Sequence, residues 1–183
     1  MGYITKYGGF WGMLPQTSGR IFWVAPSATY TVEGRSYPSS DNNDGLSPER
    51  ALRTVDYAVG LCTANEGDVI VLLHGAHSIS ATIAVDVAGI TITGIPGGPP
   101  QPRERSNSGS KRSRSRITTT ETSGIIFTVT AADVEIAYLT MTHITGGTAI
   151  SVSNAADLAY MHDLVINHTA ATSATSYGIN FPL

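Results

Sequence analysis

Acidic and histidine side chains recur through the second half of the chain, where they could support acid–base chemistry. Hydrolysis of a glycosidic bond needs two carboxyl groups, one to protonate the leaving oxygen and one to act as base or nucleophile. His162 and Asp163 are adjacent, but LAYMHDLVI (158–166) alternates too imperfectly to decide which of the two faces outward. A surface pair therefore explains them more simply than an active site does. The candidates are Asp86, Asp133, Glu135, Asp157, Asp163, His143, His162 and His168.

Other catalytic and metal-binding signatures are missing from the sequence. It has no nucleophile elbow, no phosphate-binding glycine loop and no Cys/His spacing typical of zinc. DNNDGL (41–46) has the composition of a calcium loop, but no glutamate stands at the twelfth position, so we interpret it as a turn. Cys62 is the only cysteine, which excludes a disulfide within the chain. We expect no metal and no cofactor, and we assign no catalytic residue.

A basic stretch interrupts a chain that is otherwise acidic. Residues 103–116 contain six basic residues and one acidic residue, whereas the rest of the chain contains five basic and 13 acidic residues. The acidic body disfavours nucleic acid as a partner, and the stretch has no aromatic side chain on which a base could stack. We expect a solvated loop or a contact with an acidic subunit surface, and an anionic surface polysaccharide stays open as a partner. The basic residues are Arg103, Arg105, Lys111, Arg112, Arg114 and Arg116.

The composition indicates a folded chain rich in strands. Apolar residues make up 42% of the chain and charged residues 14%, which is sufficient for a core. Small and β-branched residues predominate after Ala64 and favour strands. No stretch has the length of a transmembrane helix, and the N-terminus MGYITKYGGFWGML lacks the basic start and apolar run of a signal peptide. We therefore expect that the protein is made in a cytosol and does not insert into a membrane.

Three regions follow one another along the chain. Residues 1–40 are rich in aromatic side chains and irregular, although RIFWVAP (20–26) could form one strand. Such a segment either packs along its own domain or attaches to a partner through its aromatic residues. Residues 41–66 form a turn and a helix, and residues 67–183 form short strands with the basic insertion at 96–116. The candidate attachment residues are Tyr7, Phe10, Trp11, Phe22 and Trp23.

The helix is expected over SPERALRTVDYAVGLC (47–62). Ser47 is a suitable N-cap and Pro48 suits the first helical position. An apolar stripe at helical spacing runs along it, and we expect its cysteine to be buried. The stripe consists of Leu52, Val55, Val59 and Cys62.

Some of the strand segments recur as copies of one another. SGIIFTVTAADVEIAYLTM (123–141) aligns with GTAISVSNAADLAYMHDLVI (147–166), and this alignment places Asp157 at the position of Asp133. We interpret this aspartate pair as repeated turn chemistry, because a repeat of short strands and tight turns indicates a solenoid. The strands are expected at 68–73, 82–87, 90–95, 116–120, 125–130, 134–141, 148–153, 158–166 and 178–181.

The first half of this pattern resembles right-handed parallel β-helices of the pectin-lyase-like superfamily. The matching motifs are Asp44–Gly45 with Ser47–Pro48, Gly67–Asp68, and the turn His74–Gly75–Ala76–His77. The resemblance covers roughly residues 41–166 and implies an all-β fold: a right-handed parallel β-helix with one N-terminal capping α-helix after the irregular arm. The superfamily includes lyases with acidic calcium sites, hydrolases and non-catalytic scaffolds, so no activity follows from the fold.

An aromatic N-terminal segment before a β-helix resembles bacteriophage tailspikes and tail fibres. The resemblance implies a structural virion protein that is homotrimeric, contacts other virion proteins of the tail, portal or capsid, and attaches to the host surface. Two alternatives stay open. One is a capsid decoration or adaptor protein complete at this length, and the other is a polysaccharide depolymerase whose active coils lie beyond residue 183. We lean against an enzyme for this chain.

Overall fold

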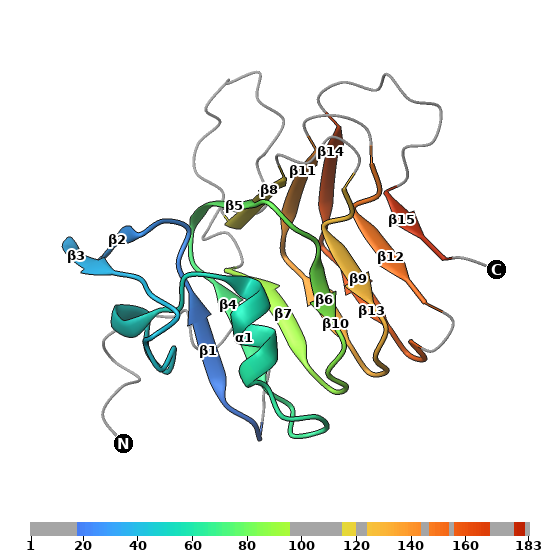
Figure 1. Cartoon of the computed structure of the whole chain (residues 1–183), viewed down its shortest axis with the longest axis horizontal. Helices are drawn as coiled ribbons and strands as arrows, with labels where there is room; N and C mark the ends of the chain where they lie inside the picture. Colours follow the sequence, from blue (N-terminus) through green and yellow to red (C-terminus); the bar gives the residue numbers. More distant parts are fainter. Residues whose placement is uncertain are drawn as a thin grey trace.

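The described part of the chain forms a coil of short parallel strands. The computed structural model describes residues 18–95, 115–119, 124–143, 147–153, 156–168 and 178–181. Each turn of the coil adds one strand to each of three parallel sheets, so neighbouring strands in a sheet come from successive turns (Figure 1). The expected strands are confirmed, but those at 134–141 and 158–166 are each divided in two by a corner of the coil. No helix among the described residues is long and apolar enough to cross a membrane.

The three sheets are defined by the order of their strands. The first contains β1 (Ile21–Val24), β4 (Val69–Leu72), β7 (Thr91–Gly94), β10 (Glu135–Ala137) and β13 (Tyr160–His162). The second contains β5 (Gly75–Ile79), β8 (Ser115–Thr119), β11 (Thr140–His143) and β14 (Val165–His168). The third contains β6 (Ile83–Val85), β9 (Phe127–Val129), β12 (Ile150–Val152) and β15 (Ile179–Asn180).

Alternate side chains of each strand point into the coil and stack on those of the next turn. In the first sheet, Phe22, Ile70, Ile92 and Ile136 stand side by side in register across β1, β4, β7 and β10. None of the four is more than 2% exposed. Equivalent apolar positions of the other two sheets join the same cluster, so one continuous core fills the coil.

The expected helix over 47–62 is wrong in its extent. A 3₁₀ turn, η2 (Pro48–Arg50), is followed by extended chain, and α1 spans Val55–Leu61 with Thr54, not Ser47, as the N-cap that bonds through its side chain. Two side chains that are distant in the sequence form hydrogen bonds with backbone groups of η2 and of the extended chain before α1. The hydroxyl of Tyr30 donates to the carbonyl of Pro48 and accepts from the N–H of Ala51. The Asp41 carboxylate accepts from the backbone N–H groups of residues 53 and 54 at 2.8 and 3.0 Å.

The remaining expectations for the helix are met in part. Val55 and Val59 are buried against the core, and α1 packs on β1, β4 and β6 at the N-terminal end of the coil (Figure 1). Leu52 is fully buried, but it lies outside α1 and bridges to Val24 of β1. Cys62 is the C-cap residue and is only partly buried.

Residues 18–40 are more ordered than the irregular arm expected for 1–40. The predicted strand at 20–26 is confirmed as β1, which pairs in parallel with β4 and belongs to the coil. A hairpin follows, made of β2 (Thr29–Val32) and β3 (Arg35–Pro38). Tyr30 of this hairpin joins Trp23, Val69 and Val71 in a second apolar cluster on the outer face of β1 and β4. The boundary at residue 40 therefore does not separate arm from coil.

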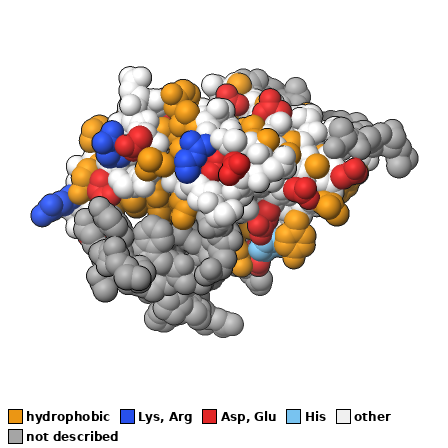
Figure 2. All heavy atoms as spheres, turned by 90° about the horizontal axis from the view of Figure 1, so that it is seen from below, with side chains coloured by type: hydrophobic (Ala, Val, Ile, Leu, Met, Phe, Trp, Pro, Cys, Tyr) orange, Lys and Arg blue, Asp and Glu red, His pale blue; other side chains and the backbone are white. Residues whose placement is uncertain are grey.

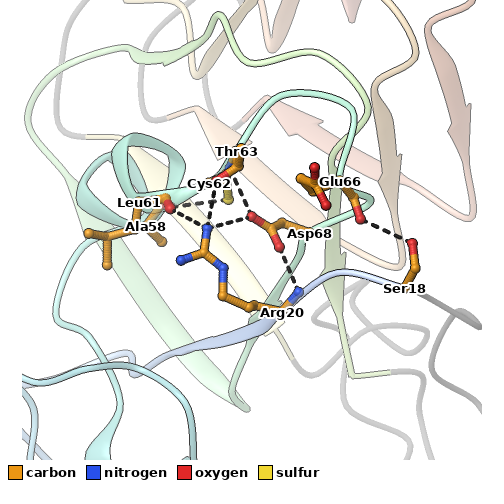
Figure 3. Close-up of polar contacts among 8 residues, drawn as sticks. All are labelled: Ser18, Arg20, Ala58, Leu61, Cys62, Thr63, Glu66 and Asp68. Carbon is orange, nitrogen blue, oxygen red and sulfur yellow. Dashed lines mark hydrogen bonds and ion pairs between the residues drawn. The ribbon is translucent and has the colours of Figure 1, made fainter.

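One buried carboxylate fastens the start of β1 to the first turn of the coil. Asp68 is 1% exposed and accepts from the backbone N–H of Arg20 at 2.6 Å and from that of Thr63 at 2.8 Å. The Arg20 guanidinium reaches the same carboxylate at 3.0 Å and the carbonyl of Leu61 at 2.9 Å (Figure 3). The Gly67–Asp68 motif thus has a structural role: it connects β1, the end of α1 and β4.

A column of residues with left-handed backbone marks the corner before the first sheet. Asn65, Gly89, Asp133 and Leu158 have φ between 56° and 72°. Where residues with a Cβ adopt this conformation it is costly, and asparagine and glycine tolerate it best. The N–H of Asp133 donates to the carbonyl of Asp157 at 2.9 Å, and Gly89 bonds likewise to residue 132. The predicted equivalence of Asp133 and Asp157 is therefore wrong by one residue, because Leu158 stands at the Asp133 position.

The basic insertion lies at the corner between the first and second sheets. In the other turns two residues separate the consecutive strands of the first and second sheets, as at Tyr138–Leu139, whereas the whole segment 95–114 separates β7 from β8. Ser115 and Arg116, which we expected in the loop or at its end, belong to β8, and Arg116 is exposed. The other five basic residues lie outside the described residues.

Candidate functional site

A polar cluster with aromatic neighbours lies on the outer face of the first sheet, over β10 and β13. Register places Glu135 beside Tyr160 and Ala137 beside His162. Because side chains alternate along a strand and Ile136 points into the core, Glu135, Tyr160 and His162 point outward. On the face seen in Figure 2, a histidine lies beside acidic and hydrophobic side chains. We call Glu135, His162, Asp163, Tyr138 and Tyr160 the outer cluster.

His162 bridges two carboxylates within the outer cluster. Its Nε2 lies 2.9 Å from Oε1 of Glu135, and its Nδ1 lies 3.0 Å from Oδ2 of Asp163. The other oxygen of Glu135 accepts from the Thr91 hydroxyl at 3.1 Å. Four residues from three successive turns are thus linked by hydrogen bonds, and Glu135 is held from two sides.

The two tyrosines stand against the imidazole ring. The Tyr138 ring meets the ring of His162 edge-on, with centroids 5.3 Å apart, and the Tyr160 ring lies 4.9 Å away at a tilt of 41°. Tyr160 is 62% exposed, so most of its ring is available to a ligand. Tyrosine combines an apolar ring with a polar hydroxyl, which suits contacts that are part apolar and part hydrogen-bonded.

The corner between β13 and β14 positions Asp163. Asp163 and Tyr138 occupy the same corner in successive turns and both have left-handed backbone, with φ of 51° and 54°. Aspartate tolerates this conformation because its short side chain bonds locally. Here the bond goes to the preceding residue, His162.

The two carboxylates stabilise the charged form of His162. The hydrogen bond to Asp163, followed by that to Glu135, raises the pKa of His162 above its ordinary value, against the opposing effect of partial burial. Each ring nitrogen of His162 already contacts a carboxylate within the cluster. The cluster is better suited to recognition, since its carboxylates accept and its rings offer apolar surface.

Comparisons with known proteins bear on the fold. The comparison with protein families found no match, and neither did the comparison with curated proteins. Among solved structures, a rhamnogalacturonan lyase is similar, with a TM-score of 0.51 and 14% sequence identity over 81% of this chain and 38% of the lyase chain. The fold is a right-handed parallel β-helix. The chain spans well under half the length of that lyase, and at this identity the likeness concerns the fold alone.

The β-helix separates most of the other acid–base candidates. Asp86 is exposed near β6, and Asp133 and Asp157 are exposed at a corner of the coil. The last two therefore lie in turns as expected, although they do not occupy equivalent positions. His143 is fully buried inside the coil. The backbone of His168 lies in β14, and its side chain lies outside the described part. Among the candidates whose side chains the structure describes, Glu135, His162 and Asp163 are the ones brought together.

The β-helix also relocates the aromatic residues expected to attach to a partner. Phe22 and Trp23 are each 2% exposed, Phe22 inside the coil and Trp23 under the hairpin. The assignment of these two as surface anchors is wrong, because they belong to the cores of this chain. Tyr7, Phe10 and Trp11 lie outside the described residues.

Two functional features were missed by sequence reasoning. The pairing of Glu135 with His162 spans 27 residues and depends on strand register, and the aligned repeat carried that signal only approximately. His77 was taken as part of a turn, but it lies in β5 and is 4% exposed. Among the described residues, no group of three or more His, Cys, Asp or Glu side chains is arranged to hold a metal ion.

Proposed function

We propose that this chain is the particle-proximal part of a tailspike-like or tail-fibre-like bacteriophage protein that binds host-surface polysaccharide through the outer cluster. The observation that carries the proposal is the exposed Tyr160 ring beside hydrogen-bonded Glu135, His162 and Asp163 on the outer face of a β-helix. The virion location and a homotrimeric assembly are parts of this proposal.

The chemistry of the outer cluster fits a saccharide. A pyranose ring has an apolar face of C–H groups and an edge of hydroxyl groups. The exposed tyrosine ring matches the first, and the carboxylates of Glu135 and Asp163 accept hydrogen bonds from the second. Asp163 is the more available of the two, since 57% of its side chain is exposed.

The N-terminal segment is proposed to attach the protein to the particle. Because β1 is part of the coil, we now limit the attachment segment to residues 1–17, with Tyr7, Phe10 and Trp11 as contact residues. The other partners in this proposal are virion proteins of the tail, portal or capsid. The basic insertion is proposed to contact a neighbouring subunit or an anionic polysaccharide.

A polysaccharide depolymerase is the second candidate. Its support is that a solved structure with the same fold is named as a rhamnogalacturonan lyase. Release of reducing or unsaturated sugars from a bound polysaccharide would support the depolymerase.

Binding to immobilised bacterial capsular and O-antigen polysaccharides tests the proposal. We expect saturable binding of at least one polysaccharide by the wild-type chain, and a loss of about tenfold or more in affinity for Tyr160→Ala. Thr128→Ala, on the outer face of the third sheet, is the matched control and should bind normally. Equal binding by both variants, or no binding across the panel, would overturn the proposal.

Incorporation into particles tests the attachment segment. A chain that begins at Ser18 keeps β1 and its buried Phe22, so it should fold but fail to join particles. Normal incorporation of this shortened chain would rule out attachment through residues 1–17. A deletion of residues 1–30 would be uninformative, because it also removes β1 from the core.

A further inference from the structure

A small pocket with a mixed polar and apolar lining lies on the first turn of the β-helix, away from the outer cluster. One wall is formed by residues 53–56, and the other by residues 77–83, where the second sheet turns into the third. The pocket has a volume of about 270 Å³. Pockets for drug-sized ligands span roughly 300–1,000 Å³. This pocket is therefore smaller than a typical site for a drug-sized ligand, and its volume suits one small ligand unit.

The first wall of the pocket is held in place by Asp41. One oxygen of this carboxylate accepts from the backbone N–H groups of Arg53 and Thr54, and the other lies 3.0 Å from the Thr54 hydroxyl. The hydroxyl of Thr54 in turn accepts from the N–H of Tyr57 at 3.3 Å. Because the backbone is fixed at both residues, the position from which the Arg53 side chain extends is fixed before any ligand binds.

His77 lies at the buried side of the pocket and is 4% exposed. Its Nε2 lies 2.8 Å from the carbonyl oxygen of Leu73, and because a carbonyl only accepts, Nε2 carries the proton. Burial, with a smaller contribution from Arg53, lowers the pKa of His77 to about 4. The ring is therefore neutral at pH 7, and Nδ1 is a hydrogen-bond acceptor.

The rest of the lining alternates hydroxyl and apolar groups. Ser78, Ser80 and Thr82 contribute hydroxyls, and between and beside them Ile79, Ala81 and Ile83 contribute apolar surface. The two charged side chains in the lining, Arg53 and Asp56, are of opposite sign. Apart from the buried imidazole of His77, no lining residue carries an aromatic ring, so the pocket offers little surface on which a planar base could stack.

We propose that this pocket binds a single uncharged monosaccharide unit. Its size suits one ring, its mixture of donors, acceptors and apolar patches matches a ring with hydroxyl groups on its edge, and its balanced charge favours a neutral ligand over an anionic one. Arg53 and Asp56 would donate to and accept from ligand hydroxyls, and Nδ1 of His77 would accept from a third. This is a second saccharide site, independent of the outer cluster.

Titration of the wild-type chain with free hexoses tests this inference. The probes are glucose, galactose, mannose and rhamnose. Glucuronate is the charged comparison, and glycerol is the comparison without a ring. Binding is measured by calorimetry and by changes in amide NMR shifts. We expect saturable binding of at least one neutral hexose, with shifts at Ser78 and Ser80. No saturable binding of any hexose, tighter binding of glucuronate, or equal binding of glycerol would overturn the inference.

Two variants with matched controls locate the binding. Arg53→Gln and Asp56→Asn should each weaken hexose binding by about tenfold. Arg50→Gln, on an exposed arginine paired with Asp44, and Asp157→Asn, on an exposed corner, should leave it unchanged. Unaltered binding by both pocket variants would overturn the assignment. Tyr160 lies outside this pocket, so loss of hexose binding in Tyr160→Ala would show that the ligand binds the outer cluster instead.

Discussion

Glu135 and His162 lie on neighbouring strands of successive turns, 27 residues apart in the sequence, and their side chains meet at 2.9 Å. This contact exists because the turns of the β-helix are in register. It also gives the outer face of the first sheet a titratable group that, when charged, donates one N–H to Glu135 and the other to Asp163.

The titration of His162 should reflect both carboxylates. We expect its pKa, measured from the NMR shift of its ring C–H, to lie above the ordinary value of about 6.5. Glu135→Gln and Asp163→Asn should each lower it, because each removes one negative partner. An unshifted His162 in the wild-type chain would contradict the hydrogen-bonded bridge.

The same shift has a consequence for stability. Because the folded pKa of His162 is raised, its contribution is present below the unfolded pKa and is lost as pH rises through the folded pKa. The effect should be below about 1 kcal/mol, since the pair is partly exposed. The free energy of unfolding, measured with denaturant at acidic and at alkaline pH, should therefore differ less between the two pH values in His162→Gln than in the wild-type chain.

Asp68→Asn should destabilise the N-terminal end of the β-helix. Although burial alone raises the pKa of Asp68, hydrogen bonds from Arg20 and Thr63 outweigh it and lower the pKa. Loss of the charge should cost about 1–3 kcal/mol in the free energy of unfolding at pH 7. Asp44→Asn, at an exposed pair with Arg50, is the control and should change stability by less than about 0.5 kcal/mol.

The pH dependence of this effect has a definite sign. The folded pKa of Asp68 is lowered, so its stabilisation is present above the unfolded pKa of about 3.9 and is lost as pH falls through the folded value. The stability difference between wild type and Asp68→Asn should shrink in strong acid. A difference that stays constant would show that the charge of Asp68 is irrelevant.

Leu158→Asn should stabilise the chain. Leu158 has φ of 59° and is 80% exposed, so its side chain gives little packing in return for an unfavourable backbone. Asparagine tolerates this conformation, and we expect a gain of up to about 1 kcal/mol. Thermal unfolding measures it. Asp157→Asn is the comparison: if it stabilises and Leu158→Asn does not, the corner is assigned one residue out of place.

Cys62 should react slowly with thiol reagents in the folded protein. Burial raises the pKa of its thiol to about 12, and the negative charge of Asp68 is the second cause of this shift. Little thiolate therefore exists at pH 8. Its sulfur also lies 3.3 Å from the carbonyl of Ala58. Labelling with iodoacetamide should become fast only in denaturant. Fast labelling of the native chain would show that this end of α1 opens readily.

The sequence predicts the strands of this fold better than it predicts its cap. Ile70, Ile92 and Ile136 lie in short β-branched segments that form the core whatever their exact partners are, so their pattern is sufficient. The helix at 47–62 fails because Tyr30 and Asp41, which lie outside it, take the backbone groups of its first half. Such long-range hydrogen bonds leave no periodic signal.

The outer cluster could be predicted only in part. Glu135, His162 and Asp163 were among the acid–base candidates, and the two tyrosines lie near them in the sequence. The contacts between these side chains depend on the register of β10 with β13, in which Glu135 pairs with Tyr160. Between β9 and β12 the paired residues, Phe127 and Ile150, are closer together in the sequence, so the spacing between equivalent residues differs from one sheet to another. The aromatic anchors fail for a different reason: composition does not distinguish Trp23 in a core from a tryptophan on a surface.

The long corner between β7 and β8 shows how this fold tolerates change. Although the segment 95–114 replaces the short connections found at the equivalent corners, Ser115 still pairs with Gly75 and Thr119 with Ile79. Lengthening a loop costs only about 0.6 kcal/mol for each doubling. Selection can therefore vary the length and charge of this corner almost independently of the coil, and the same position is a natural graft point at which a foreign peptide can be displayed on the scaffold.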